Sequence, residues 1–266
     1  MLLIIAAGAL AWSSTAFGVV VTVLLGLALA EWLQLTGAAR SVSIVVALIV
    51  SGALLVVLVA SPFTIETFVL PLGAVAAALW IAIVVLLLQP RAMELRLPRV
   101  VSIALAVLLT LAAWFALMWF LSQGVLVLLS ILMIVWVADT AAYFAGRAFG
   151  RRKLAPHISP GKTWAGVVGA IVAVLLFALV VWLLVPDRRI YSNNMFESVG
   201  PALALLLLAV LVAVSVAGDL FESLLKRQAG VKDSGQLLPG HGGVLDRVDA
   251  MVPLLPSAVV IQWLIR

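Results

Sequence analysis

The chain contains no cysteine and very little charge. Of its 266 residues, 10% are charged and 66% are hydrophobic, with a mean hydropathy of +1.31. The absence of cysteine excludes disulfides, zinc-thiolate sites, iron–sulfur clusters and cysteine nucleophiles. Soluble globular proteins have about 25% charged residues and about 45–50% apolar residues, so this composition excludes a soluble domain and a disordered chain. We therefore expect lipid to surround most of the fold.

Apolar runs divide the chain into candidate membrane segments, which are residues 1–12, 17–33, 42–60, 66–89, 99–121, 124–138, 165–185, 201–217 and 250–265. Helices satisfy every backbone polar group within lipid, whereas a β-barrel would show alternating polarity that these runs lack. Only a short Ser-Ser-Thr sequence at residues 13–15 separates the first two runs, which can form one long helix or two. We predict an all-α, polytopic integral membrane protein with eight or nine transmembrane helices, the first run being retained.

Basic residues between these runs set the expected orientation. They form three groups: Arg91, Arg96 and Arg99; Arg147, Arg151, Arg152, Lys153 and Lys162; and Lys226, Arg227, Lys232 and Arg247. Because Lys and Arg concentrate in short cytoplasmic loops, nine crossings would put all three groups on the cytoplasmic face of the inner cell membrane. Loop orientation and anionic lipid explain the basic charge, so we expect no nucleic acid partner. One short loop, Asp187-Arg188-Arg189, contradicts the rule with two arginines on the expected outer face.

Ionisable residues are concentrated in the second half of the chain. Both histidines and eight of the eleven acidic residues lie from Asp139 onward. We find no internal repeat and therefore predict one polytopic domain, 1–266, with mainly scaffold helices in 1–137 and catalytic helices and loops in 138–266. In the first half we expect Glu31 and Trp32 to be anchors at the membrane interface.

The polar stretch 218–249 carries the strongest chemical signal. If the preceding helix continues into it, i, i+3, i+4 and i+7 spacing puts four polar residues on one face, namely Asp219, Glu222, Ser223 and Lys226. Several glycines, including those of the His-Gly-Gly sequence at 241–243, then break the helix and let backbone N–H groups approach a ligand. A second helical stretch would bring Asp246 and Asp249 one turn apart.

Carboxylates beside cations and a glycine turn indicate phosphoryl or nucleotidyl transfer. Magnesium takes hard oxygen ligands, usually one or two carboxylates together with substrate phosphates. Lys and Arg neutralise the charge that develops on phosphate oxygens in the transition state. The alternative is an ordinary cytoplasmic loop with interfacial anchors, but such a loop seldom needs a His-Gly-Gly turn flanked by acids. The sequence has none of the short motifs of metalloproteases, serine hydrolases or dinucleotide enzymes.

A second polar stretch, 138–166, is expected on the same face. Its sequence Gly161-Lys162-Thr163 is not part of a Walker A motif, because proline occupies the first glycine position and no soluble strand precedes it. Ser159, Lys162 and Thr163 lie where the next apolar helix begins, and free N–H groups at a helix N-terminus favour an anion. Asp139 is either a metal ligand or a polar residue at its helix exit.

The stretch 223–249 matches the pattern S-x-x-K-R-x-x-x-x-K-D-x-G-x-x-L-P-x-H-G-G-x-x-D-R-x-D. The matching residues are Ser223, Lys226, Arg227, Lys232, Asp233, Gly235, Leu238, Pro239, His241, Gly242, Gly243, Asp246, Arg247 and Asp249. This pattern resembles the signature of the phosphatidate cytidylyltransferases, also called CDP-diacylglycerol synthases. The upstream stretch resembles that family's second motif in Asp139, Tyr143, Gly146, Ser159, Pro160, Lys162 and Thr163. It departs from the motif at Gly161 and Ala165, where the family has a basic residue and a glutamate.

The resemblance implies that CMP is transferred from CTP to phosphatidate, giving CDP-diacylglycerol and pyrophosphate in phospholipid biosynthesis. We expect Mg²⁺ to be held by Asp219, Glu222, Asp246, Asp249 and Asp139, and a second cation is compatible with this set. Catalytic roles are expected for Lys226, Arg227, Lys232, Asp233, His241 and Arg247. Substrate binding is expected for Ser159, Lys162, Thr163, Ser223, Gly242 and Gly243. CTP, phosphatidate and membrane lipid are the expected partners, and a homo-oligomer is compatible with the sequence.

Three alternatives to this interpretation come from other substrates or other protein classes. A related enzyme would use another lipid phosphate, such as a polyprenyl phosphate, and the departures at Gly161 and Ala165 favour it. A transporter or channel would have ionisable groups or broken helices near the bilayer midplane, whereas the acids here cluster at segment ends. A CDP-alcohol phosphotransferase would need a D-G-x-x-A-R motif that the chain lacks.

Overall fold

The computed structural model describes residues 2–60, 62–89, 92–185, 187, 189–237, 240 and 242–266. Its elements, in chain order, are α1 (Leu2–Trp12), α2 (Ser14–Leu35), α3 (Arg40–Ala60), α4 (Pro62–Leu87), α5 (Arg99–Gln123), α6 (Val125–Phe149), β1 (Lys153–Ala155), β2 (Ser159–Thr163), α7 (Trp164–Leu184), α8 (Tyr191–Gln228), the 3₁₀ helix η1 (Leu245–Arg247) and α9 (Met251–Leu264). The two short strands pair antiparallel, and all other elements are helical.

The apolar runs form membrane-length helices. Seven helices in the described part of the chain are long and apolar enough to cross a membrane, namely α2 to α8. The two remaining apolar helices are shorter, since α1 has 11 residues and α9 has 14. The all-α, polytopic membrane architecture predicted from composition is therefore confirmed, and the chain is an integral membrane protein.

The first two apolar runs form two helices rather than one. Ser13 has an extended backbone, and its hydroxyl accepts a hydrogen bond from the Ala16 backbone N–H at 3.0 Å. A serine in this position satisfies one of the free N–H groups at a helix start. The Ser-Ser-Thr sequence thus ends α1 and caps α2.

Three local features differ from the helix boundaries predicted from the apolar runs. Helix α6 continues ten residues beyond Asp139 to Phe149, so Asp139 lies within the helix. A β-hairpin of β1 and β2 precedes α7. Helix α8 starts at Tyr191, and its backbone kinks at Gly200, whose φ of 77° suits a residue without a side chain immediately before proline.

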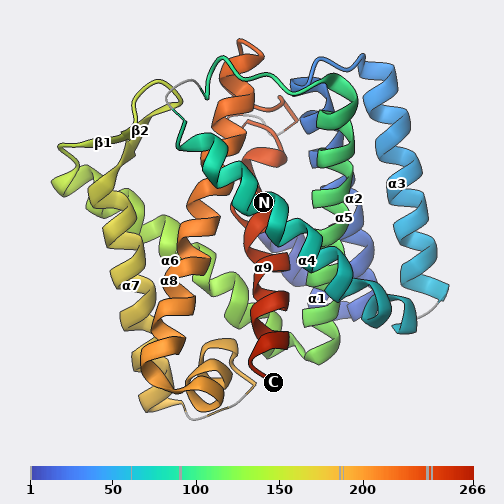
Figure 1. The fold of residues 1–266 in the computed structure, drawn as a ribbon. Helices are drawn as coiled ribbons and strands as arrows, with labels where there is room; N and C mark the ends of the chain where they lie inside the picture. Colours follow the sequence, from blue (N-terminus) through green and yellow to red (C-terminus); the bar gives the residue numbers. More distant parts are fainter. Residues whose placement is uncertain are drawn as a thin grey trace.

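Helix α9 lies in the middle of the bundle (Figure 1), packed against α4, α5 and α8. Helices α6, α7 and α8 form a group on one side of α9, and α2 and α3 lie together on the other side. Large side chains fill the space between these layers, and Trp114, Phe120, Leu208 and Leu254 are among the fully buried residues. This packing fixes the ends of α8 and α9, from which the acidic residues project.

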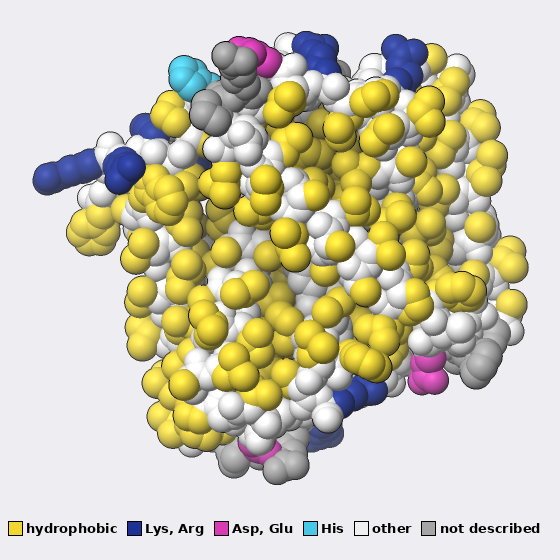
Figure 2. Space-filling view, in the orientation of Figure 1, with side chains coloured by type: hydrophobic (Ala, Val, Ile, Leu, Met, Phe, Trp, Pro, Cys, Tyr) yellow, Lys and Arg dark blue, Asp and Glu magenta, His cyan; other side chains and the backbone are white. Residues whose placement is uncertain are grey.

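The loops of the three basic groups meet at one end of the bundle, which we call the polar end. The Arg96 guanidinium donates to the carbonyl of Gln228 at 3.1 Å, which joins the loop before α5 to the end of α8. Arg227 donates to the carbonyl of Ile158 at 3.3 Å, which joins α8 to the β-hairpin. Figure 2 shows hydrophobic side chains over most of the visible face and charged side chains gathered toward its two ends.

Candidate active site

Three carboxylates meet where α8 passes the start of α9, and we call them the acidic triad. Carboxylate oxygens of Asp219, Glu222 and Asp249 all lie within 4.8 Å of one another. Asp219 and Glu222 share a face of α8 because they are three residues apart. The continuation of this helix past Ala217, predicted from spacing, is confirmed, since α8 extends to Gln228.

A glycine on α8 allows Asp249 to come so close. A Cβ at Gly218 would lie 2.5 Å from the Asp249 carbonyl oxygen and 2.5 Å from Pro253, so no larger residue fits without displacing α9. Asp249 is half-buried next to this contact. Burial, reinforced by the negative charges of Asp219 and Glu222, raises the pKa of Asp249 well above its usual range.

A lysine from the hairpin faces the triad from the other side. Lys162, on β2, forms an ion pair with Asp219 at 2.5 Å. Both residues line a cavity of about 400 Å³ between α6, β2, α7 and α8, whose wall also carries Asp139, Arg147 and Lys153. The cavity therefore combines carboxylates with three cationic side chains, a suitable setting for a polyphosphate.

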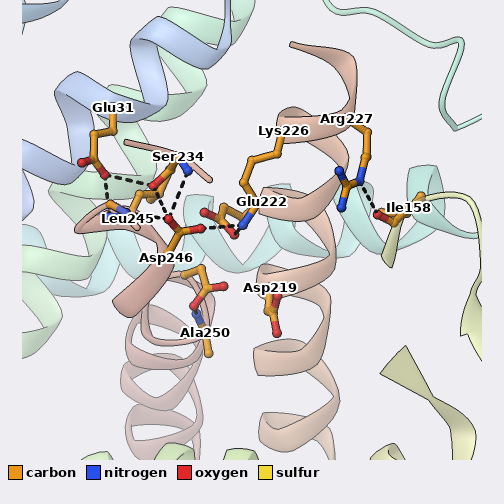
Figure 3. Close-up of polar contacts among 12 residues, drawn as sticks. Glu31, Ile158, Asp219, Glu222, Lys226, Arg227, Ser234, Leu245, Asp246 and Ala250 are labelled. Carbon is orange, nitrogen blue, oxygen red and sulfur yellow. Dashed lines mark hydrogen bonds and ion pairs between the residues drawn. The ribbon is translucent and has the colours of Figure 1, made fainter. Parts of the chain in front are cut away.

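A second set of residues connects α2, α8 and the loop before α9; we call Glu31, Lys226, Ser234 and Asp246 the loop cluster. The Lys226 ammonium lies 2.6 Å from Glu222 and 2.5 Å from Asp246. The other oxygen of Asp246 accepts hydrogen bonds from the Ser234 backbone N–H at 3.0 Å and the Gly243 N–H at 2.8 Å, and it lies 2.9 Å from the Ser234 hydroxyl. Figure 3 draws these contacts.

Asp246 is held in its ionised form by these donors. Burial disfavours the charge, but hydrogen bonds with Glu222 and Lys226 and from two backbone N–H groups outweigh burial, and the pKa of Asp246 lies well below its usual range. Asp246 lies in η1, and Asp249 lies in the turn that follows it. The sequence predicted these two residues one turn apart on a helical stretch. They lie on the short η1 and the turn after it, and the Asp246 carboxylate faces Lys226 while the Asp249 carboxylate faces the acidic triad.

Glu31 on α2, predicted from the sequence to be an anchor at the membrane interface, belongs to this region. That prediction is wrong, because Glu31 is only 4% exposed and accepts a hydrogen bond from the Leu245 N–H at 2.8 Å. The same oxygen lies 3.0 Å from the Ser234 hydroxyl. Trp32 is buried too, against the ring of Phe221.

The close approach of the loop to Glu31 depends on small residues. A Cβ at Gly235 or at Gly243 would overlap the Glu31 carboxylate. A signal for Glu31 does exist in the sequence. It is an ionisable residue inside an apolar run, and such a residue needs a partner because burying a charge in an apolar medium is costly.

The other predicted site residues are distributed around these two groups. Thr163 caps α7 by accepting from the Gly166 N–H at 3.1 Å, as expected for the start of that helix. Asp139 is exposed on the cavity wall, and Ser223 is buried on α8. Ser159 is half-buried on β2. The remaining predicted residues are Lys232, Asp233 and Arg247, which are exposed, Gly242, which is half-buried, and His241, which lies outside the described residues.

The donor set of the acidic triad fits a divalent metal ion. All three residues offer the hard oxygen ligands that Mg²⁺ prefers. Glu222 Oε1 is buried and has no hydrogen-bond donor among the described residues. Lys162 and Lys226 pair with only part of this set of carboxyl groups, and a divalent cation would stabilise the ionised form of the others, among them Asp249 with its raised pKa.

Proteins of known name match parts of the chain. One is the phosphatidate cytidylyltransferase of Haemophilus influenzae, which is 48% identical over 135 residues, or 50% of this chain and 44% of that protein. The Pseudomonas aeruginosa protein of the same name is 40% identical over 165 residues, or 60% of this chain and 57% of that protein. The Thermotoga maritima protein of that name is 38% identical over 133 residues, covering 50% of this chain and 47% of that protein. The chain thus spans about half the length of the curated relatives it matches.

A family-level comparison covers nearly the whole chain. The sequence model of the Cytidylyltransferase family matches residues 1–265, which include every helix described above. Both polar stretches that carry the acidic triad, the cavity and the loop cluster fall within this match. The chain belongs to the cytidylyltransferase family.

Proposed function

We propose that this protein is a metal-dependent phosphatidate cytidylyltransferase, which transfers CMP from CTP to phosphatidate and releases CDP-diacylglycerol and pyrophosphate. The observation that carries the proposal is the acidic triad beside Lys162 and Lys226, in a chain of the cytidylyltransferase family. Relatives named for this activity match 50% and 60% of the chain. Membrane lipid and the two substrates are then its partners.

The acidic triad would hold Mg²⁺ through Asp219, Glu222 and Asp249. The ion, when bound, withdraws charge from phosphate oxygens and offsets the repulsion between two anionic substrates. Asp246 contributes by fixing the Lys226 ammonium at 2.5 Å. Asp139 borders the cavity beside Lys162 and is available to a second cation.

The cations of the cavity would bind the phosphates. Lys162, Lys153 and Arg147 line a space of about 400 Å³, enough for the triphosphate part of a nucleotide. Lys226 stabilises charge that develops on the phosphate oxygens during transfer. The lipid phosphate is already an anionic nucleophile near neutral pH, so its oxygen attacks the α-phosphate of CTP directly and no strong general base is needed.

The loop residues supply further contacts in this proposal. Lys232, Arg227 and Arg247 clamp the substrates' phosphates, and the backbone N–H groups of Gly242 and Gly243 donate to a phosphate oxygen. Ser159, Thr163, Ser223, Asp233 and His241 complete the predicted set of binding and catalytic residues. The division into scaffold residues 1–137 and catalytic residues 138–266 is part of the same proposal, with Glu31 as an exception that supports the loop from the first half.

The polar end would face the cytoplasm of the inner cell membrane. Basic side chains from three loops gather there, as in short cytoplasmic loops. CTP would reach the cavity from water, while phosphatidate would remain in the adjacent leaflet.

A second lipid substrate is the competing candidate. Gly161 lines the cavity, and it stands where the family pattern has a basic residue. A cavity wall with one cation fewer favours a lipid phosphate other than phosphatidate, such as a polyprenyl phosphate.

Pyrophosphate release by detergent-solubilised protein tests the proposal. The wild type, given CTP, phosphatidate and Mg²⁺, should release pyrophosphate and form CDP-diacylglycerol. Chelation of Mg²⁺ and Asp249→Asn should each abolish release, whereas Glu66→Gln, at an exposed position on α4, should not change it. No release by folded wild-type protein with phosphatidate, but release with a polyprenyl phosphate, would replace phosphatidate as substrate. No release with either lipid would overturn the proposal.

A further inference from the structure

A polar pocket lies at the end of the bundle opposite the polar end. It has a volume of about 200 Å³ and is formed by the last turn of α5, the start of α6, the start of α8 and the end of α9. Along α5, the 25 residues from Arg99 to Gln123 correspond to about 36 Å of helix, which is more than the apolar thickness of a bilayer. The pocket and the acidic triad therefore face opposite surfaces of the membrane.

Two arginines border this pocket. The Arg266 guanidinium lies 5.1 Å from the centre of the Trp119 ring, a cation–π contact that holds the side chain over the pocket. No Asp or Glu in the described part of the chain forms an ion pair with Arg266. Arg189 is paired with Asp187 at 2.7 Å, but its side chain is 73% exposed and retains donors for a second anion.

The uncharged lining offers both a donor and an unused acceptor. The Gln262 amide nitrogen donates to Asn194 Oδ1 at 2.9 Å, which orients the Asn194 side chain so that its own NH₂ group remains a donor. Gln262 Oε1 is buried and has no hydrogen-bond donor among the described residues. A buried acceptor without a donor is costly, so a ligand that supplies a hydroxyl would be favoured here.

Exposed apolar side chains lie next in sequence to residues that line the pocket. Val125 and Leu126 at the start of α6 are 42% and 41% exposed, and Trp263 next to Gln262 is 55% exposed. A ligand with acyl chains could thus keep its chains on these surfaces while its headgroup occupies the pocket. A volume of about 200 Å³ suits a phosphate with a small polar substituent rather than a whole lipid.

We propose that this pocket binds the headgroup of an anionic phospholipid that carries a hydroxyl, the phosphatidylglycerol class, in the leaflet opposite the polar end. Arg266, Arg189 and the Asn194 amide bind the phosphate, and Gln262 Oε1 accepts from the headgroup hydroxyl. The site accounts for Arg189, which the orientation rule would not put at this end of the molecule. The inference does not depend on the reaction performed at the polar end.

Native mass spectrometry of the detergent-solubilised full chain tests this site with phosphatidylglycerol, phosphatidylethanolamine or phosphatidylcholine added singly. Wild type should retain one phosphatidylglycerol more firmly than either other lipid. The double variant R189Q/R266Q should weaken that binding about tenfold, because each arginine contributes a charged hydrogen bond. Arg40→Gln, an exposed arginine at the polar end, is the matched control and should bind as wild type does.

Asp187→Asn provides a test in the opposite direction. It removes the carboxylate that occupies Arg189, so phosphatidylglycerol should bind more tightly than in wild type. Gln262→Leu should lower the preference for phosphatidylglycerol over phosphatidylethanolamine.

Two outcomes would overturn the proposal. Equal retention of phosphatidylglycerol by wild type and R189Q/R266Q would show that the lipid is held elsewhere. If inorganic phosphate at equal concentration displaced the lipid completely and raised the melting temperature as much as the lipid does, the site would be one for a free anion. Melting temperatures of all variants, measured without lipid, should agree within a few degrees, so that a loss of binding is not a loss of fold.

Discussion

The acidic triad and the loop cluster are neighbours with opposite electrostatic characters. In the triad, three carboxylates face one another, and burial and like charge raise the pKa of Asp249. In the loop cluster, donors reach both oxygens of Asp246, and the pKa of Asp246 is lowered. Only two residues separate Asp246 from Asp249 in the chain. Position in the signature therefore does not decide what a carboxylate does.

This difference indicates that the acidic triad and the loop cluster have different roles. A carboxylate that accepts hydrogen bonds at both oxygens, as Asp246 does, stabilises the fold that supplies the donors. A group of carboxylates with few donors is unfavourable in isolation and becomes favourable when a cation binds. We therefore assign ligand binding to the triad, and we assign support of the loop and of Lys226 to the loop cluster.

Asp249→Asn should have the largest effect on activity. Removing a triad carboxylate should reduce kcat by about a thousandfold, the scale seen when a group that stabilises the transition state is lost. The melting temperature without Mg²⁺ should not fall, because the substitution also removes repulsion among three carboxylates. Steady-state kinetics and a melting curve measure the two quantities. Activity within tenfold of wild type would exclude Asp249 from the metal site.

Asp246→Asn should reduce both activity and stability. The amide cannot accept all the donors that now reach Asp246, and Lys226 loses one of its two carboxylate partners. We expect a loss of unfolding free energy of about 1–3 kcal/mol together with reduced kcat. Chemical denaturation in detergent measures the first. An unchanged stability would contradict the separation between the two groups.

Glu31→Gln should test whether Glu31 positions the loop. An amide in place of the carboxylate weakens the bonds to the Leu245 N–H and the Ser234 hydroxyl, so Asp246 and Lys226 should be less well held. We expect kcat to fall about tenfold, on the basis of roughly 1–2 kcal/mol for such a bond, while KM for phosphatidate stays within twofold. Glu66→Gln, exposed on α4, is the control and should leave both parameters unchanged. A fall in melting temperature with no change in kcat would assign Glu31 a purely structural role.

Stabilisation by Mg²⁺ should increase with pH. The pKa of Asp249 is raised in the metal-free fold, so above the usual pKa of about 3.9 this carboxyl ionises in the unfolded chain but keeps its proton in the fold. The free energy of unfolding therefore decreases as pH rises, until the pH exceeds the raised pKa. Mg²⁺ binds the ionised form, so binding releases a proton and is weaker at low pH. Melting curves with and without Mg²⁺ should show a shift of a few degrees at about pH 8 and little shift near pH 5. A shift that is independent of pH would contradict this account.

Much of the architecture follows from local sequence. Hydropathy over about 20 residues predicts membrane helices because lipid requires internal backbone hydrogen bonding, and within the described residues each predicted apolar run corresponds to a helix. The spacing of Asp219 and Glu222 predicts a shared face because both lie on one helix. Asp249 joins them through the tight contact at Gly218, which the sequence pattern alone does not reveal.

Long-range contacts limit what the sequence could predict. Glu31 and Ser234 are 203 residues apart in the chain, so no local spacing connects them. The sequence-based prediction makes Asp246 a metal ligand with Asp219 and Asp249, yet the oxygens of Asp246 face Lys226, Ser234 and Gly243. Which neighbour a carboxylate meets depends on how the loop folds back against α2, and that is decided by tertiary packing.

Binding of Mn²⁺ to metal-free protein, followed by electron paramagnetic resonance, tests the central claim most directly. Mn²⁺ takes the same oxygen ligands as Mg²⁺ and reports binding without substrate or turnover. We predict that Asp249→Asn weakens Mn²⁺ binding by at least about tenfold, whereas Asp246→Asn changes it by less than about threefold. Equal binding by wild type and Asp249→Asn would contradict the assignment of the acidic triad as the metal site.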